Sequence, residues 1–267
     1  MEQHPDHDAV AEQVRSWYTC STPKLGISVT RETFGVLSNS ERAAFRRLVL
    51  TVDDPAEVAG ALAAAAEFYG SSEFEVWVDD RSRAERLGPA LEAVGLSKAQ
   101  DTIVLALVGA IRAQPGPPGL AVEDVTDLDG LRDWARVKLQ GFADDEAMPD
   151  ADRLTAEIEG WKQEWPVCRY QLGREAGEVV SILGHYMGND QMVFNVATRV
   201  PYRHRGIAQA MLARWTREAE GLVRSLLINC ADGGPAAALY RRLGFADEVY
   251  WHRRYGRSAE VLGVTGS

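Results

Sequence analysis

The sequence predicts an α/β protein made of two units in tandem. Apolar stretches with strand-like alternation take turns with stretches of helical spacing along most of the 267 residues. A segment rich in proline and glycine, 114–119, interrupts this pattern, and proline there removes backbone donors and disfavours helix in the residue before it. The order strand, helix, strand, helix, strand occurs on both sides of the segment. We therefore expect one domain at residues 1–113 and a second at residues 119–256.

The first unit contains three stretches typical of strands and two typical of helices. The second helix ends at Gly95, which is followed by the large apolar residue Leu96. Two carboxylates, Asp53 and Asp54, follow the first strand and would repel a phosphorylated ligand at that turn. The expected strands are 47–52, 73–79 and 102–107, and the expected helices are 55–69 and 89–96.

The second unit contains a fuller set of elements. Asp127 is the predicted N-cap of a helix that runs to about residue 139, and an acidic loop at 141–152 precedes a second helix. Pro235 occupies a favoured first-turn position of the last helix, and Gly244 ends that helix. One more helix is expected at 208–220. The expected strands are 120–125, 167–173, 179–187, 191–198, 225–230 and 249–255, and residues from 256 onward look like a loose tail.

The bulk composition, with 46% hydrophobic and 25% charged residues, is that of a soluble globular protein. The longest apolar stretch, 102–111, is too short to span a bilayer, and the acidic, polar start of the chain is unlike a signal peptide. No cysteine–histidine cluster has metal-ligand spacing. The chain has three scattered cysteines, which is typical of reduced thiols in the cytoplasm: Cys20, Cys168 and Cys230. We therefore expect a cytoplasmic protein with no metal and no membrane partner.

The charge balance argues against nucleic acid as a partner. The chain has 29 Lys and Arg against 39 Asp and Glu, which gives a net charge of −10 and a pI near 5.1. A protein that binds a duplex needs a broad basic face to release counterions. The cluster Arg203-His204-Arg205 is too small to supply one.

The segment 200–208, Val-Pro-Tyr-Arg-His-Arg-Gly-Ile-Ala, lies between an expected strand and an expected helix. Backbone N–H groups at the start of a helix, together with the helix dipole, form a site for a phosphate or diphosphate. Gly206 and Ala208 are small, so the backbone can approach an anionic ligand closely. Arg203 and Arg205 add positive charge, but the sequence lacks the Gly-Lys-Ser/Thr of a mononucleotide-binding loop.

A second motif follows at 234–245, Gly-Pro-Ala-Ala-Ala-Leu-Tyr-Arg-Arg-Leu-Gly-Phe. With the Arg-x-x-Gly-x-Ala pattern of 203–208 before it, and a helix and an apolar strand between the two, the chain resembles the GCN5-related N-acetyltransferase (GNAT) superfamily. The resemblance implies a mixed, mostly antiparallel central sheet flanked by helices. It also implies a tandem arrangement with a degenerate N-terminal unit, similar to glycine N-acyltransferase-like and mycothiol synthase-like proteins.

The resemblance further implies acetyl-coenzyme A as cosubstrate and an amine as acyl acceptor. By the family's pattern the pyrophosphate lies at Arg203, His204, Arg205, Gly206, Ile207 and Ala208. The pantetheine arm follows the backbone of Val196, Ala197 and Thr198. The motif tyrosine, here Tyr240, holds or protonates the leaving thiolate. The alternative for Tyr240 is a packing role only.

Two departures from the family pattern concern the catalytic base and coenzyme binding. Many relatives have a glutamate on the strand before the turn, whereas 192–198 contains no acid. The candidates for the proton acceptor are Asn195, Asp190, His185 and Tyr186, and none is assigned. Gly234 stands where the family commonly has asparagine, so that role is lost or passes to Asn229 or Asp232. Cys230 is interpreted as a small buried residue.

The acceptor is expected to be a small molecule or amino compound. The acidic loop, with Asp144, Asp145, Glu146, Asp150 and Asp152, would attract a cationic amine or is simply solvated. Four aromatic residues line the acceptor pocket or belong to the core: Phe142, Trp161, Trp165 and Tyr170. The alternative functions are a protein lysine or N-terminal acetyltransferase and a non-catalytic acyl-coenzyme A sensor. A monomer or homodimer is expected.

Overall fold

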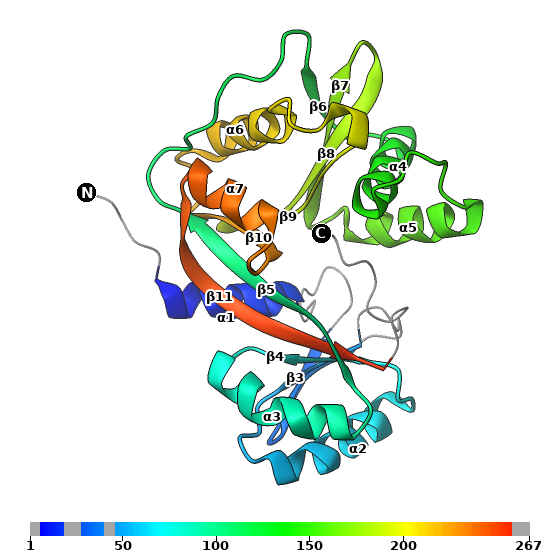
Figure 1. Ribbon diagram of the computed structural model, residues 1–267, viewed down its shortest axis with the longest axis vertical. Helices are drawn as coiled ribbons and strands as arrows, with labels where there is room; N and C mark the ends of the chain where they lie inside the picture. The colour runs from blue at the N-terminus through cyan, green and yellow to red at the C-terminus, as the bar shows by residue number, and fades with distance from the viewer. Residues whose placement is uncertain (1–5, 19–27, 40–45, 258–267) are drawn as a thin grey trace. The chain divides into compact units, whose positions relative to one another are not determined.

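A computed structural model describes residues 6–18, 28–39 and 46–257 of the chain. The predicted loose tail beyond residue 257, the start of the chain and Cys20 lie outside these ranges. The chain divides into two compact units, each an assembly of strands with helices on them (Figure 1). The C-terminal unit comprises Leu105–Asp247, and the N-terminal unit comprises the described residues of Asp6–Val104 together with the strand residues from Glu248 onward.

The N-terminal unit orders its strands β1-β2-β3-β4-β11-β5. The β3–β4 pair is parallel, whereas β1–β2, β2–β3 and β4–β11 are antiparallel. Figure 1 shows α2 and α3 on one side of these strands. The elements are α1 (His7–Tyr18), β1 (Ser28–Glu32), β2 (Gly35–Asn39), β3 (Arg47–Leu50), the 3-10 turn η3 (Pro55–Glu57), α2 (Val58–Tyr69), β4 (Glu75–Val78), α3 (Arg81–Ala93) and β5 (Ser97–Leu107).

The C-terminal unit orders its strands β10-β9-β8-β7-β6. The β9–β10 pair is parallel, and β6–β7, β7–β8 and β8–β9 are antiparallel. The elements are β6 (Ala121–Asp124), α4 (Leu128–Ala143), α5 (Ala151–Glu164), β7 (Cys168–Glu175), β8 (Glu178–Tyr186), β9 (Asp190–Thr198), the 3-10 turn η4 (Val200–Tyr202), α6 (Ile207–Ala219), β10 (Ser225–Ala231), α7 (Pro235–Leu243) and β11 (Phe245–Gly256).

Helices α4 and α6 cover opposite faces of this sheet. Neighbouring residues of a strand point to opposite sides. On β8, a Cβ at Gly184 would lie 3.0 Å from Trp134 of α4, whereas the His185 ring lies 5.8 Å from that of Trp215 on α6. Trp134 and Trp215 are both almost fully buried. The core of the unit therefore lies on both faces of β8 and β9.

The predicted fold class, an α/β protein with a mixed and mostly antiparallel sheet, is confirmed. The predicted repeat also has a structural counterpart. In each unit a strand, a helix and a parallel strand follow one another, as β3-α2-β4 and as β9-α6-β10. The division into units differs from the predicted boundary at 114–119. The units part within β5, between Val104 and Leu105, and within β11, between Asp247 and Glu248, and 114–119 lies inside the C-terminal unit.

Several predicted elements differ in length or were missed. Helix α4 continues to Ala143, so the acidic loop begins three residues later than expected. Helix α3 begins at Arg81, where the Asp80 side chain accepts a hydrogen bond from the Arg83 N–H, and Pro89 lies inside it rather than at its start. The helix α1 and the hairpin β1–β2 were not predicted. The five-residue strands of the hairpin give little periodicity, whereas the buried residues Val10, Val14 and Trp17 of α1 do have helical spacing.

Candidate functional site

The parallel pair β9–β10 separates along its length. Its residues pair from Ser225 with Asp190 to Ile228 with Val193, although β10 continues to Ala231. Beyond that point β9 keeps only its pairing to β8. The predicted pantetheine residues Val196, Ala197 and Thr198 belong to this stretch and pair with Leu183, Ile182 and Ser181 of β8. Their backbone groups on the β10 side are therefore not used by that ladder, and an extended ligand can bind to them.

A bulge in β9 lies at the point where the two strands part. Gly184 pairs with Asn195 and the next residue, His185, pairs with Val193, so Phe194 is left without an opposite residue. The Phe194 ring lies over Gly184, and a Cβ built at Gly184 would be 2.8 Å from it. Bulges bend a strand and redirect its groups, and they are frequent beside functional sites.

The predicted diphosphate turn has a backbone suited to an anion. After η4, His204 and Gly206 both have positive φ, 60° and 79°. Gly206 is the N-cap of α6, and no side chain caps the helix. A Cβ at Gly206 would meet no atom within 4 Å. Uncapped N–H groups at a helix start, with left-handed residues just before them, form a concave donor site for phosphate.

The two arginines of the turn are bound to the protein's own acceptors. Arg203 donates to the carbonyl oxygens of Gly141 (2.6 Å) and Thr198 (3.0 Å), and it pairs with Asp144 at 2.5 Å. Arg205 forms two parallel hydrogen bonds with Glu175, of 2.7 and 2.6 Å. Arg203 thus ties the end of β9 to the end of α4, and only the more exposed Arg205 is placed to exchange its carboxylate for a phosphate.

The β7–β8 hairpin supplies two carboxylates to the turn, and no sequence pattern predicts them there. Besides Glu175 on Arg205, Glu178 accepts hydrogen bonds from Arg199 (3.2 Å) and from the Tyr202 hydroxyl (3.0 Å). These residues lie about 20 to 30 positions away from the turn in the chain. Only the hairpin pairing brings them together.

Tyr240 lies on α7 with only 6% of its surface exposed, and its ring contacts Phe245 edge-on. Burial raises the pKa of its phenol, and the nearby Cys230 raises it further. Its hydroxyl makes no hydrogen bond to the residues that the structure describes. The side chain is therefore a buried, protonated donor, as a thiolate-binding role requires.

The candidates for the proton acceptor separate into different environments. Asp190 is 1% exposed and bound to Arg224, at the end of β9 away from the turn, so the structure argues against it as the base. Burial beneath Trp215 lowers the pKa of His185 to about 4, and its Nδ1 has no hydrogen-bond partner in the part of the chain that the structure describes. Asn195 follows the bulge and is partly exposed.

Tyr186, the fourth candidate, lies against the bulge. Its ring centroid is 4.7 Å from that of Phe194, and its hydroxyl donates to the Glu164 carboxylate at 3.3 Å. Glu164 ends α5 and is 4% exposed. Glu164 was not among the predicted residues, because nothing in its sequence surroundings distinguishes it from a surface glutamate. The pair places a buried carboxylate beside the bulge, from α5 rather than from β9.

The predicted aromatic residues form one cluster with others. Trp161 stacks on Phe194 at 5.3 Å and meets Trp134 at 5.2 Å, and Tyr170 contacts Trp134 at 4.9 Å. The cluster includes Trp165, which meets Tyr170 edge-on, while Phe142 is half-buried on α4. Trp161 and Phe194 are partly exposed and form an aromatic wall, in which the Lys138 Nζ already lies 5.1 Å from the centroid of the Trp161 ring.

The carboxylates of the acidic loop are mostly engaged within the protein. Asp144 pairs with Arg203, and Glu146 pairs with Arg199 at 2.7 Å and accepts a hydrogen bond from the Val200 N–H. Asp145 and Asp150 accept hydrogen bonds from nearby backbone N–H groups, and Asp150 thereby caps α5. The loop therefore anchors the turn, which is a third role besides the two expected.

The start of α7 has no side-chain cap, because Gly234 is its N-cap. The glycine departs from the family's asparagine and leaves the first N–H groups of α7 open. Among the described residues there is no group of three or more His, Cys, Asp or Glu that could hold a metal. In the same part of the chain, no helix combines the length and apolar character needed to cross a bilayer.

Comparison with known proteins places this site in a family. The family model of the acetyltransferase (GNAT) domain matches residues 166–247, which include the separated strand pair, the turn, α6 and α7. The chain contains a GNAT domain. The predicted recognition is thereby confirmed, and GNAT domains transfer acetyl groups from acetyl-coenzyme A. No curated protein matches the chain.

Solved structures similar to this one include GNAT proteins over most of their length. A GCN5-related N-acetyltransferase from Kribbella flavida is 17% identical, with 92% of this chain and 95% of that chain covered and a TM-score of 0.63. One from Sphaerobacter thermophilus is 15% identical, with coverages of 96% and 94% and a TM-score of 0.53. A tandem GNAT protein from the clavulanic acid biosynthesis pathway is 11% identical, with coverages of 86% and 82% and a TM-score of 0.54.

The turn of the N-terminal unit that corresponds to the GNAT diphosphate turn holds its own carboxylates. The Asp54 side chain accepts a hydrogen bond from the Ala56 N–H (2.9 Å). At the corresponding position of the C-terminal unit, the N-cap of α6 is Gly206, which has no side chain to accept such a bond. Asp53 is bound by Arg83 and Arg86, which lower the pKa of its carboxyl group. The donors and the positive charge at this turn are therefore already used by the protein.

Proposed function

We propose that the protein is an acetyl-coenzyme A-dependent N-acyltransferase that acts on the amine of a small molecule or amino compound. The observation that carries the proposal is the continuity of three features in the GNAT domain. The free edge of β9 leads into the turn, and the turn ends at the glycine-capped start of α6. The free edge of β9 would bind the extended pantetheine arm, and the turn would bind the diphosphate. The arm and the diphosphate are joined in the coenzyme, as the strand edge and the turn are joined in the chain.

The leaving group is received by Tyr240. Attack of the amine on the thioester carbon forms the amide bond and breaks the carbon–sulfur bond. The buried, protonated phenol stabilises the departing thiolate by a hydrogen bond. The separated strand β10 leads through Cys230 toward α7, which holds this tyrosine.

The acceptor amine is proposed to bind along the aromatic wall of Trp161 and Phe194. Aromatic faces attract an ammonium group, and the Tyr186–Glu164 pair beside them supplies negative charge and a route for the proton. The wall is formed by single side chains of α5 and β9, which favours a small molecule. A protein acceptor remains the rival for the same chemistry and predicts turnover of peptides in preference to small amines.

The test is calorimetric titration of the protein with acetyl-coenzyme A and coenzyme A, followed by thiol release with a panel of amines and lysine peptides. Binding of both coenzyme forms and release with small amines support the proposal. Binding without release on any acceptor would identify a sensor instead, and absence of binding would remove the coenzyme from the turn.

The matched variants are Gly206→Glu and Gly206→Ala. Both place a Cβ at a φ of 79°, so both bear the same backbone strain, but only glutamate adds length and negative charge at the donor groups. We expect Gly206→Glu to lose coenzyme binding by more than about 100-fold, and Gly206→Ala to retain most of it. Thermal unfolding of both variants confirms that the fold persists. Equal affinity of the two variants would contradict the assignment of the turn.

A further inference from the structure

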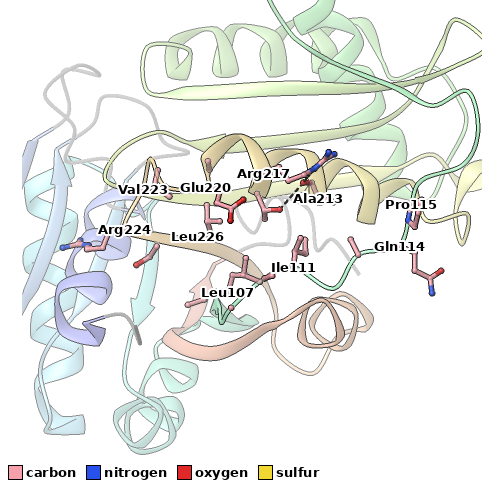
Figure 2. A pocket seen from close by; sticks show the side chains of 18 residues that line it. Leu107, Ile111, Gln114, Pro115, Ala213, Arg217, Glu220, Val223, Arg224 and Leu226 are labelled. Carbon is pink, nitrogen blue, oxygen red and sulfur yellow. Dashed lines mark hydrogen bonds between the residues drawn. The ribbon is translucent and has the colours of Figure 1, made fainter. Parts of the chain in front are cut away.

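A cavity lies in the C-terminal unit, between α6 and the segment that follows β5. Its volume is about 700 Å³, within the range of small-molecule sites. Figure 2 shows Ala213 and Arg217 of α6 and the C-cap residue Glu220 along one side of it, and Leu107 and Ile111 along the other.

The cavity is remote from the coenzyme turn. Glu220 follows Gly206 by 14 residues, about 20 Å along a helix. Ser225, which also lines the cavity, pairs with Asp190 at the start of β9, whereas the turn follows the end of that strand. The two sites are thus at opposite ends of the β9–β10 pair, and the reaction proposed above does not use this cavity.

The cavity has an aliphatic part and two buried hydroxyl residues, Thr216 and Ser225; the Thr216 hydroxyl donates to the Ala213 carbonyl oxygen. Leu107, Ile111 and Leu226 provide large aliphatic side chains. The Ser225 side chain is 7% exposed, and its Oγ makes no hydrogen bond within the described residues. A buried hydroxyl without a partner is unfavourable, and a ligand group or water in the cavity relieves that cost.

Two exposed residues of opposite charge line the cavity. Arg217 lies in the last turn of α6, and Glu220 is the C-cap residue that follows the helix. The Arg217 Nε donates to the Ala213 carbonyl oxygen at 3.0 Å, and its terminal nitrogens have no partner among the described residues. The Glu220 carboxylate likewise has no partner there. The third charged residue, Arg224, is bound to Asp190.

We propose that this cavity binds an α-amino acid with a large apolar side chain, as the zwitterion. The carboxylate pairs with Arg217, the ammonium group pairs with Glu220, and the side chain enters the aliphatic interior. Arg217 lies in the last turn of α6 and Glu220 is the C-cap residue three positions later, so one small ligand with adjacent charges can reach both groups. An apolar acid or an apolar amine satisfies only one of them.

The experiment is calorimetric titration with L-phenylalanine, 3-phenylpropionate and phenethylamine. The last two lack the ammonium group and the carboxylate respectively and keep the ring. We expect L-phenylalanine to bind at least about tenfold more tightly than either analogue, because each analogue loses one charge pair; a tenfold loss corresponds to about 1.4 kcal/mol. Equal affinities for the three compounds, or no heat of binding up to about 10 mM L-phenylalanine, would overturn the proposal.

Variants locate the site without disturbing the fold. Arg217→Gln and Glu220→Gln replace exposed groups and should each weaken L-phenylalanine binding by about tenfold. Glu159→Gln, an equally exposed change on α5, should leave it unchanged. Affinity for coenzyme A should be the same in all three, which separates this site from the coenzyme turn. Undiminished L-phenylalanine binding in both cavity variants would place the amino acid elsewhere and overturn the proposal.

Discussion

Tyr240 illustrates how one residue combines a sequence motif with an environment that the motif does not specify. The motif gives the tyrosine and its place on a helix. The structure adds burial to 6% exposure, a raised pKa and a hydroxyl without a hydrogen bond to the described residues. Burial keeps the proton on the phenol at neutral pH, so the group can donate to a thiolate.

Replacing Tyr240 by phenylalanine removes the donor and keeps the ring that packs on Phe245. We expect kcat to fall by about 100-fold, with the KM for acetyl-coenzyme A little changed, because the hydrogen bond matters most as the thiolate forms. Steady-state kinetics measures both. An unchanged kcat would mean that the tyrosine only packs, and the melting temperature serves as the control for stability.

The partners of Arg203 and Arg205 could not be predicted from the motif that contains them. Both arginines were expected to attract a phosphate. The Arg203 guanidinium instead donates to the carbonyl oxygens of Gly141 and Thr198 and pairs with Asp144. Those acceptors belong to α4, β9 and the loop after α4. A motif can name a cation, but the partner that neutralises it comes from elsewhere in the chain.

The β7–β8 hairpin acts on the turn as an element. Its carboxylates Glu175 and Glu178 hold the turn through Arg205, Arg199 and Tyr202. The same negative charges repel a diphosphate that approaches the turn. The hairpin therefore holds the turn in its conformation and also lowers the affinity of the turn for the coenzyme.

Glu175→Gln should therefore increase coenzyme affinity by about fivefold, corresponding to about 1 kcal/mol for a partly exposed pair. The change frees Arg205 for a phosphate and removes a like charge beside it. Titration of coenzyme A at low and high salt measures the effect, which should shrink as salt screens the charges. Weaker binding would show that Glu175 serves only to order Arg205, and Glu159→Gln is the control.

The bulge of β9 depends on a close approach to β8. A Cβ at Gly184 would lie 2.8 Å from the Phe194 ring and 3.0 Å from the ring of Trp134, which is fully buried. Gly184→Ala should lower the free energy of unfolding by about 1–3 kcal/mol and reduce activity by displacing the bulge. Urea denaturation and the thiol-release assay test the two effects. Gly177→Ala, at an open turn of positive φ, is the control for backbone strain alone.

At the scale of the whole molecule, each unit has one buried histidine with a lowered pKa. Burial lowers the pKa of His185 in the C-terminal unit to about 4 and that of His252 in the N-terminal unit well below its usual value. Asp124 and Glu218 near His185 oppose this effect and Arg169 adds to it, but burial is the largest cause.

A histidine with a lowered pKa is neutral in the folded protein while its unfolded form, with a pKa near 6.5, takes up a proton. The unfolded state then binds more protons, so stability falls as the pH decreases from about 6.5 toward 4. We expect the midpoint of urea unfolding to decrease over this range. His185→Gln should flatten part of the slope, and an unaltered slope would show that this histidine is not neutral when folded.

The sequence by itself determined the family, the α/β class and the position of the diphosphate turn. These depend on local properties, namely apolar periodicity, proline and glycine at helix ends, and two motifs in a fixed order. It also gave the carboxylates Asp53 and Asp54 that occupy the corresponding turn of the N-terminal unit.

Only the tertiary structure decided which groups meet. The bulge at Phe194, the Glu164–Tyr186 pair, the hairpin carboxylates on the turn and the cavity beside α6 all join residues that are distant in the chain or lie on different elements. Strand register and helix packing fix such contacts, and both depend on the burial of the whole core rather than on neighbours in sequence. For the same reason the units part inside β5 and β11 and not at the proline-rich segment, because long strands continue wherever pairing partners are present.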